Sequence, residues 1–393
     1  MEFPEHETTA SDIMEMFARK TGLSASGNQP KRYLWTDAFA VSNFLQLYHQ
    51  TGEQKYLQLA LDLVDQVHQT LGKHREDDQR SGWISGLGES DGQLHPTIGG
   101  LRIGKELGER SSSHPYDERS EWDHDGQYYH YLTKWIHALH QVSSVTEDTI
   151  FSQWACELAK TIHKAFVHQE RPEEPKRLYW KMSIDLTYPL VSSMGRHDPL
   201  DGLVTYHEVR RQYVGASKCD LDDEIADLSK ICSGSIWTTG DPLGIGGLLF
   251  DACRILQMIA DETYAEDQTL LLKVLQSSIA GLQHFVAQST PEHQPEKRLA
   301  FRELGLAIGL HGVPMMLALL ENTPGLGSRN ILRDILNNLM PAVSVAKSIE
   351  GFWLSATNRR YESWRAHEDI NMVMLATSLA PEGFLNLKAM KLK

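Results

Sequence analysis

The sequence has few cysteines and none that are closely paired. The four cysteines among its 393 residues are Cys156, Cys219, Cys232 and Cys253, and no two of them form a C-x-x-C motif. Widely spread single cysteines are typical of proteins in a reducing compartment. We therefore interpret all four as reduced thiols and expect a cytoplasmic protein.

Basic residues and long apolar runs are also scarce. Lys and Arg total 38 against 52 Asp and Glu, which gives a formal net charge of −14. Sequence-independent binding of nucleic acid needs clustered Lys and Arg, so we expect no nucleic-acid partner and no attraction to an anionic membrane. No run of about 18 apolar residues is present, and the first residues lack the basic and apolar regions of a signal peptide. The sequence therefore predicts neither a membrane span nor an export signal.

What the sequence does contain is apolar residues at helical spacing. Phe39, Val41, Phe44, Leu45 and Tyr48 recur at this spacing in residues 38–50. Gly52 follows as a stop signal, and a second amphipathic helix is expected over about 54–71. Two such helices joined by a short turn predict a helical hairpin.

The same pairing recurs along the chain, and strand signals are sparse. Helices are expected over 128–142 and 147–168, 243–260 and 268–288, 301–321 and 331–347, with a last one over 369–380. Weaker helical units are expected over 96–107, and over 199–212 with 221–231. The pattern predicts an all-α chain that forms one domain over residues 1–393. Three connections, 82–92, 178–201 and 348–366, are long for a helical fold, and loops of this size are usually functional.

Polar and aromatic residues gather where the first helix of each pair is expected to begin. Trp122, Asp123, His124 and Asp125 precede the helix expected from residue 128. One aspartate would suffice as an N-cap, so this cluster contains more than capping requires. Similar residues stand at the other predicted helix starts: Trp35 and Asp37, Asp241, Glu303, and Trp364, His367 and Glu368.

Repeated hairpins with helix starts rich in Trp, Asp and His resemble the six-hairpin (α/α)6 toroid superfamily. This superfamily includes many glycosidases, unsaturated-uronyl hydrolases and N-acylglucosamine 2-epimerases, and the resemblance is to the superfamily rather than to one of its families. It implies a toroid of helical hairpins with long functional loops at one end. It also implies a small carbohydrate substrate bound where the inner helices begin.

Glycoside hydrolysis generally uses two carboxyl groups, one to protonate the leaving group and one to activate water or attack. We predict Asp123 as one of them, with Asp37 or Glu368 opposite, although each carboxylate alone could instead cap a helix or form a salt bridge. The residues predicted to bind the substrate are Trp35, Trp122, His124, Arg196, His197, Asp241, His311, Trp364 and His367. His130 and His137 stand seven apart rather than in a compact H-x-x-x-H motif, so we predict no metal site, and no cofactor is expected.

Two other functions remain open from the sequence. A metal-independent sugar epimerase or isomerase would need two groups of suitable pKa on opposite sides of one carbon, and two histidines can serve. His197, His311 and His367 are the candidates. A non-catalytic helical scaffold that binds a glycan or peptide is the third reading. The sequence does not specify the oligomeric state.

Overall fold

The computed structural model describes residues 9–24, 30–212, 219–261, 268–288, 294–323 and 328–387. Contacts divide these residues into two compact units. We call described residues 18–235 the N-terminal unit, and described residues 236–387 together with 9–17 the C-terminal unit. The prediction of an all-α chain built from helical hairpins is confirmed.

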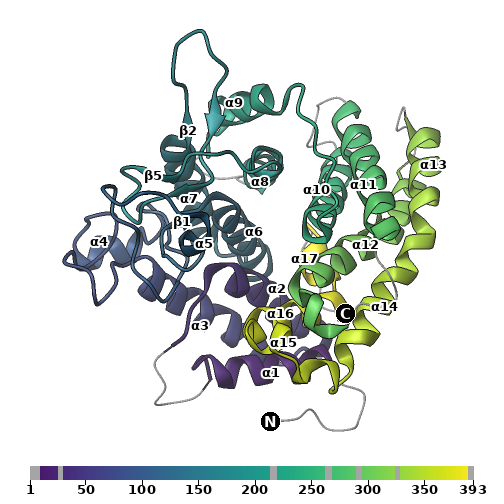
Figure 1. Cartoon of the computed structure of the whole chain (residues 1–393), viewed down its shortest axis with the longest axis horizontal. Coiled ribbons are helices and arrows are strands. Elements are labelled where there is room, and N and C mark those ends of the chain that lie inside the picture. Colours follow the sequence, from purple (N-terminus) through teal and green to yellow (C-terminus); the bar gives the residue numbers. More distant parts are fainter. Residues whose placement is uncertain are drawn as a thin grey trace. The chain divides into compact units, whose positions relative to one another are not determined.

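The N-terminal unit is built from three helical pairs. The pairs are α2 (Leu34–Thr51) with α3 (Gln54–Leu71), α6 (Tyr129–Thr146) with α7 (Thr149–Phe166), and α8 (Asp198–Gln212) with α9 (Asp222–Cys232). The first helices of the pairs are neighbours, since α6 packs against both α2 and α8 (Figure 1).

The two helices of a pair are buried differently. In α2, every residue from Leu34 to Leu47 is buried, as expected for a helix surrounded by protein. In α3, burial follows one apolar stripe that includes Tyr56, Leu63 and Val67. The first helices are therefore the inner helices of this unit. Gly52 ends α2 with φ of 71°, and its N–H donates to Tyr48 O at 2.8 Å, as its position in the sequence predicted.

Short strands and loops lie between α3 and α8. Strands β1 (Gln127–Tyr128), β4 (Lys181–Met182) and β5 (Pro189–Val191) form an antiparallel sheet in the order β1-β4-β5, and β2 (Val167–His168) pairs with β3 (Arg177–Leu178). Two short helices, α4 (Glu89–Leu94) and α5 (Glu118–Glu121), interrupt the loops. The helix predicted over 96–107 is wrong. Gly100 and Gly104 have φ of 72° and 92° there, which a continuing right-handed helix excludes.

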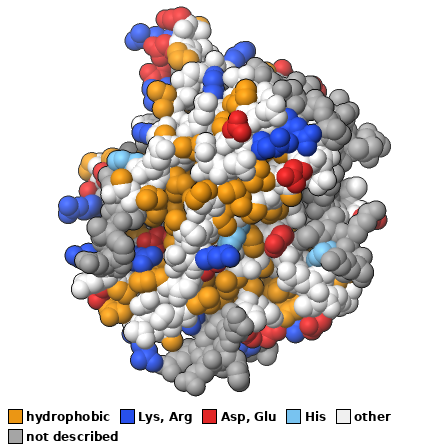
Figure 2. Space-filling view, turned by 90° about the vertical axis from the view of Figure 1, so that its right-hand side faces the viewer, with side chains coloured by type: hydrophobic (Ala, Val, Ile, Leu, Met, Phe, Trp, Pro, Cys, Tyr) orange, Lys and Arg blue, Asp and Glu red, His pale blue; other side chains and the backbone are white. Residues whose placement is uncertain are grey.

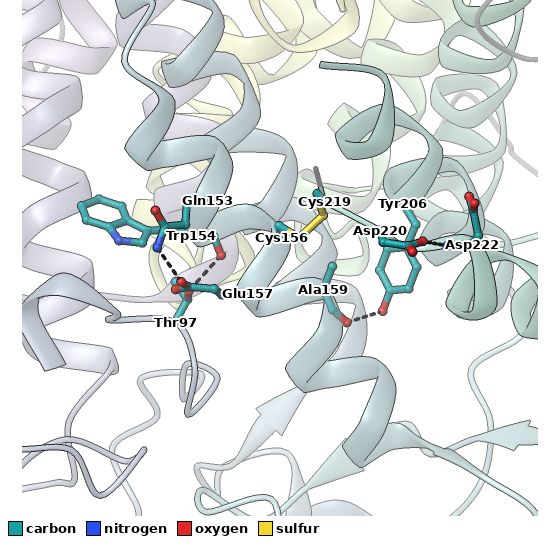
Figure 3. Close-up of a disulfide and its surroundings, with 10 residues drawn as sticks. All are labelled: Thr97, Gln153, Trp154, Cys156, Glu157, Ala159, Tyr206, Cys219, Asp220 and Asp222. Carbon is teal, nitrogen blue, oxygen red and sulfur yellow. Dashed lines mark hydrogen bonds between the residues drawn. A yellow bond between two sulfur atoms is a disulfide. The ribbon is translucent and has the colours of Figure 1, made fainter. Parts of the chain in front are cut away.

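A disulfide joins Cys156 in α7 to Cys219, which stands just before α9 (Figure 3). The prediction that all four cysteines are reduced is therefore wrong. The two residues are 63 positions apart, yet the fold brings their Cα atoms to 6.0 Å, within the usual range for a disulfide. Cys232 and Cys253 are free and buried.

The C-terminal unit contains longer and more apolar helices. They are α10 (Pro242–Ala260), α11 (Thr269–Gln288), α12 (Ala300–Glu321), α13 (Arg329–Leu339), α14 (Val343–Leu354) and α16 (Glu368–Leu379), with the short α15 (Glu362–Arg365) and α17 (Glu382–Leu385). Helix α1 (Ala10–Lys20) begins the described chain. Helix α10 packs against α11 and α12, and α12 also packs against α14 and α16. The loop predicted over 348–366 is partly helical, because α14 continues to Leu354.

Three glycines allow α10 and α12 to approach closely. A Cβ atom on Gly246 would collide with the backbone carbonyl of Gly305, and one on Gly309 would collide with the carbonyl of Gly246. Only hydrogen fits between the two backbones here. The crossing therefore depends on glycine for space rather than for backbone flexibility.

By length and composition, three helices of the described chain could cross a membrane, although the sequence showed no uninterrupted apolar run. They are Pro242–Ala260, Thr269–Ala287 and Ala300–Glu321. Most of the apolar stretch is buried within the structure in the first (72%) and third (61%), but only 33% of it in the second. Apolar side chains also gather across the middle of the face that carries α13 and α14 (Figure 2).

Candidate active site in the N-terminal unit

Rings from four parts of the N-terminal unit contact one another at the starts of α2 and α6. We call this set the aromatic patch, and it consists of Tyr33, Trp35, Trp122, Tyr128, His130, Tyr131 and Trp180. Trp122 and Trp180 meet with centroids 5.1 Å apart, and His130 lies parallel to Trp180 at 6.1 Å. Tyr128 is buried beneath them, whereas Trp122 is 42% exposed. The patch therefore presents ring surface to solvent on a packed base.

Two structural contacts assemble the patch. The starts of α2 and α6 meet where the hydroxyl of Tyr33 lies 2.7 Å from that of Tyr131. Strand β1 pairs with β4 with Tyr128 opposite Lys181, which brings Trp180 beside Tyr128 at a centroid distance of 5.2 Å. Within this unit, the inner-helix starts therefore lie together.

A buried ion cluster holds the segment that carries Trp122. The Lys181 ammonium, with no exposed surface, donates to Glu121 Oε1 at 2.8 Å, Glu121 O at 2.9 Å and His124 O at 2.8 Å. Burial lowers the pKa of Lys181, and the Glu121 carboxylate opposes this shift. Arg110 bonds the other oxygen of Glu121 at 2.6 Å. The segment is thereby fixed to the short sheet on both sides.

The two aspartates of the central cluster have different environments. Asp125 is fully buried and accepts from Arg102 Nη1 at 2.9 Å and from the N–H of Gly104 at 3.0 Å. Asp123 is exposed. Neither caps α6, because the N-cap position is Tyr128 and has no side-chain cap. Asp125 is therefore a structural anchor, and Asp123 is available to a ligand.

Lys105 lies at the edge of the patch near Asp123. Its ammonium stands 5.3 Å above the ring of Tyr33. Burial lowers the pKa of Lys105, and the charges of Asp123 and Asp125 oppose that shift. The charge of Asp123 therefore acts on Lys105, whose ammonium stands over a ring of the patch.

A second carboxylate borders the patch on the side of α8. Asp198 is the first residue of α8, is 7% exposed, and places Oδ2 3.6 Å from His130 Nδ1. Neither Asp198 nor His130 is among the residues predicted from the sequence to form the site, although Asp198 directly follows the predicted ligands Arg196 and His197.

Deeper between α6 and α8, the polar contacts continue as a ladder. Lys134 Nζ donates to Asp201 Oδ1 at 2.6 Å. Glu208 lies 2.7 Å from His137 Nδ1 and 3.0 Å from His140 Nδ1. Burial works to raise the pKa of Glu208, but the charges and hydrogen bonds of the two histidines outweigh it and hold that pKa well below its usual range. These groups lie inside the unit and do not face solvent.

The remaining predicted residues of the N-terminal unit have varied positions. Trp35 belongs to the aromatic patch. Asp37 is buried, accepts the N–H of Tyr33 at 2.9 Å and lies 3.5 Å from Arg32 Nη1, so it is bonded at the start of α2. His124 Nδ1 lies 2.6 Å from Gly108 O. Arg196 is exposed and His197 is half-buried.

The C-terminal unit contains the other predicted residues. Asp241 is the N-cap of α10, accepting from the N–H of Gly244 at 3.1 Å, and it also pairs with Arg302 at 2.8 Å. Asp241 therefore caps α10, and Pro242 follows it at the first helical position. His311 Nε2 lies 2.6 Å from Glu350 Oε1.

Three more lie around α15 and the start of α16. Trp364 is buried and stacks on Trp353 at 5.6 Å. Burial lowers the pKa of Arg359 to about 10 against the opposing charge of Glu368, the first residue of α16. His367 is exposed and meets the ring of Phe301 at 5.5 Å. The predicted convergence of these residues with Asp123 stays a prediction. Among the described residues, no group of three or more His, Cys, Asp or Glu side chains is arranged to hold a metal ion.

No protein-family model matches the chain, and no curated protein matches it. Among solved structures, the GH76A α-1,6-mannanase of Salegentibacter sp. is similar over 95% of this chain and 98% of that one, with a TM-score of 0.53 and 12% identity. An inactive variant of that mannanase with two Asp→Asn substitutions, in complex with α-1,6-mannotriose, has a TM-score of 0.52 at 12% identity over the same shares of both chains. A GH76 α-mannanase of Bacteroides thetaiotaomicron has a TM-score of 0.52 and 8% identity, over 95% of this chain and 96% of that one. These structures are six-hairpin α/α toroids, so the predicted fold class is confirmed.

Proposed function

We propose that the chain is a glycoside hydrolase whose active site is the aromatic patch. The observation that carries the proposal is a set of contacting rings with the exposed Trp122 at its surface and two carboxylates beside it, Asp123 next to Trp122 in the chain and Asp198 against His130. Aromatic faces bury the apolar faces of sugar rings, and a carboxyl pair supplies the acid and base that glycoside hydrolysis needs. The fold supports this function, because structures that share it include mannanases and a complex with α-1,6-mannotriose.

Each part of the patch has a role in this proposal. Trp122 stacks on the sugar, since it is the exposed ring of the patch, and Trp180 adjoins it at 5.1 Å. Asp123, exposed to water, accepts the proton of the water that attacks the anomeric carbon. Lys105 contributes a positive charge near Asp123, and the charge of Asp123 opposes the lowering of the Lys105 pKa by burial.

Asp37 and Glu368 were the two carboxylates predicted to act opposite Asp123, and the structure argues against the first of them. Asp37 is buried and already accepts a backbone N–H, so it is poorly placed to exchange protons with a substrate. The predicted role of Glu368 as the second carboxylate stays a prediction. An epimerase would need two histidines facing a sugar. Of the histidines expected for that role, His311 Nε2 lies 2.6 Å from Glu350 Oε1, and His197 and His367 stay predictions. Two other histidines, His137 and His140, do lie together in the N-terminal unit, but both are buried against Glu208. Hydrolysis is therefore the better-supported reaction.

A panel of oligosaccharides that includes α-1,6-mannotriose tests this function. Mass spectrometry separates cleavage from no turnover, and NMR separates both from isomerisation. We expect cleavage, and we expect Asp123→Asn to lower kcat at least ~100-fold, since acid–base help is worth about 10²–10⁴-fold. The melting temperature should stay near that of the parent, because Asp123 is exposed and caps no helix.

Asp91→Asn is the matched control, because Asp91 is an exposed acid outside the patch. It should retain full activity. Isomerised product would establish the epimerase instead. Absence of turnover across the panel, or full activity of Asp123→Asn, would overturn the proposal.

A further inference from the structure

We propose that His130 and Asp198 form the proton-donating pair of the site, acting opposite Asp123. This inference rests on the proposed function and names the second catalytic group. The pair lies where α6 begins beside the start of α8, with His130 Nδ1 3.6 Å from Asp198 Oδ2.

Both facing atoms are buried and otherwise unpartnered. Within the described part of the chain, neither His130 Nδ1 nor Asp198 Oδ2 makes a hydrogen bond. A buried polar atom without a partner is costly, and such atoms are uncommon in folded proteins. A shared proton or a substrate hydroxyl between the two would satisfy both. We therefore infer that these two side chains, whose facing atoms are buried without a hydrogen bond beside the exposed Trp122, react with a ligand.

The next polar contact between α6 and α8 is that of Lys134 with Asp201, and the carboxylate there has a different partner. Asp201 receives the Lys134 ammonium at 2.6 Å and also the hydroxyl of Thr133. That carboxylate is neutralised and bonded as a structural group. Asp198, one helical turn earlier, faces a titratable imidazole instead of a fixed cation. The carboxylate at the patch therefore faces an imidazole, whereas the deeper carboxylate is held by an ammonium.

The surroundings of the pair orient it without neutralising it. The ring of His130 lies between Trp180, parallel at 6.1 Å, and Tyr131, edge-on at 4.8 Å. Trp35 of α2 contacts it at 6.0 Å. Of the other titratable groups nearby, Tyr128 and Tyr131 contact the ring of His130 at 5.3 and 4.8 Å, and the Tyr33 hydroxyl meets that of Tyr131. The Lys134–Asp201 ion pair lies one turn further along the two helices, and Arg196 and His197 precede Asp198 in the chain.

Gly195 brings the loop before α8 against the carboxylate. A Cβ atom at Gly195 would stand 2.5 Å from Asp198 Cγ, so no larger residue fits without moving the carboxylate. The loop backbone therefore closes one side of Asp198. His130 stands against the carboxylate on another side, toward the aromatic patch.

In the reaction, the bond between the anomeric carbon and the leaving oxygen breaks as the proton of the pair moves to that oxygen. The oxygen of a water forms the new bond to the anomeric carbon, and Asp123 accepts the proton that this water loses. Proton transfer from Asp123 to the pair through solvent restores the starting state. Each turnover consumes one glycosidic bond and one water molecule and releases two saccharide products.

His130→Gln and Asp198→Asn test the pair with two substrates of different leaving groups. One is the oligosaccharide that the parent cleaves, and the other is the dinitrophenyl glycoside of the same sugar, whose leaving group needs no protonation. We expect each variant to lose at least ~100-fold in kcat on the oligosaccharide and to stay within a few-fold of the parent on the aryl glycoside. The alkaline limb of the pH–rate profile should also disappear. Asp123→Asn, the comparison variant, should lose activity on both substrates.

The experiment distinguishes a failure of the His130–Asp198 proposal from a failure of the proposed hydrolase function. If the parent cleaves glycosides and Asp123→Asn is inactive, but both pair variants keep their activity on the oligosaccharide, the pair is not the acid and the function stands. Equal loss on both substrates would also overturn the pair as proton donor. If the parent cleaves no glycoside, both proposals fail. Should Asp198→Asn not fold, His130→Gln still decides, because His130 is only partly buried.

Discussion

At the scale of single residues, Glu208 shows how a buried charge is held by its partners. It has no exposed surface and lies between His137 and His140. Since its pKa is well below the unfolded value, it stabilises the fold at pH values above about 4.3. The contribution falls as pH drops through the folded pKa. Acid should therefore weaken this site.

We expect Glu208→Gln to lower the free energy of unfolding at pH 7 by about 3–5 kcal/mol, as for a buried pair that loses one member. Urea unfolding from pH 7 to pH 3 measures it, and the difference from the parent should shrink below about pH 4. Glu157→Gln is the matched control, because Glu157 also faces a histidine Nδ1, that of His95 at 2.8 Å, but in a partly exposed pair. It should cost less than about 1 kcal/mol. Equal losses would contradict the assignment.

Some residues of the candidate site could be predicted from the sequence, and others could not. Trp35, Trp122 and Asp123 were accessible because they stand in a local cluster before a helical pattern. Asp198 and Trp180 were not, because each joins the patch only through a tertiary contact, with His130 of α6 and with Tyr128 of β1 respectively. Helical periodicity contains no information about which helix starts meet.

At the scale of elements, the crossing of α10 and α12 depends on glycines that face each other. Gly246 and Gly247 are neighbours in α10 with opposite surroundings. A Cβ atom at Gly246 meets the backbone of α12, whereas one at Gly247 meets nothing within 4 Å. The two positions therefore separate the effect of packing from that of helix propensity.

Gly246→Ala should destabilise the protein by about 1–3 kcal/mol, because overpacking forces the helix backbones apart. Gly247→Ala should instead stabilise it by up to about 1 kcal/mol, because alanine is the better helix former. Thermal unfolding of the two variants beside the parent measures both signs. The same sign for both substitutions would mean that the crossing does not need the glycine.

Helices of regular periodicity were predicted well, and irregular segments were not. The helix predicted over 128–142 is α6, Tyr129–Thr146, and the one predicted over 243–260 is α10, Pro242–Ala260. The segment 96–107 failed because apolar spacing was read across Gly100 and Gly104, whose positive φ angles break a helix. Local patterns predict a helix only where no turn residue interrupts them.

At the scale of the whole molecule, helical spacing predicts repeated hairpins, and the toroid class came from the resemblance of these hairpins and their helix starts to the six-hairpin superfamily. The disulfide was beyond such reasoning, because it depends on where α7 meets the chain before α9. It closes a loop across the α6–α8 region, near the bond from the Tyr206 hydroxyl to Ala159 O at 3.0 Å (Figure 3). The cytoplasmic location expected from the sequence stays a prediction. The disulfide argues against it, because such bonds persist in oxidising compartments.

Counting the thiols of protein purified from its natural source distinguishes the disulfide-bonded protein from a reduced, cytoplasmic one. Denatured without reductant, it should expose two reactive thiols, those of Cys232 and Cys253, and after reduction four. Loop-closure entropy for a loop of this length predicts that Cys156→Ser lowers the free energy of unfolding by about 4 kcal/mol. Cys232→Ser is the control that leaves the disulfide intact. Four thiols without reductant, together with equal stability of the parent with and without reductant, would restore the reduced, cytoplasmic reading.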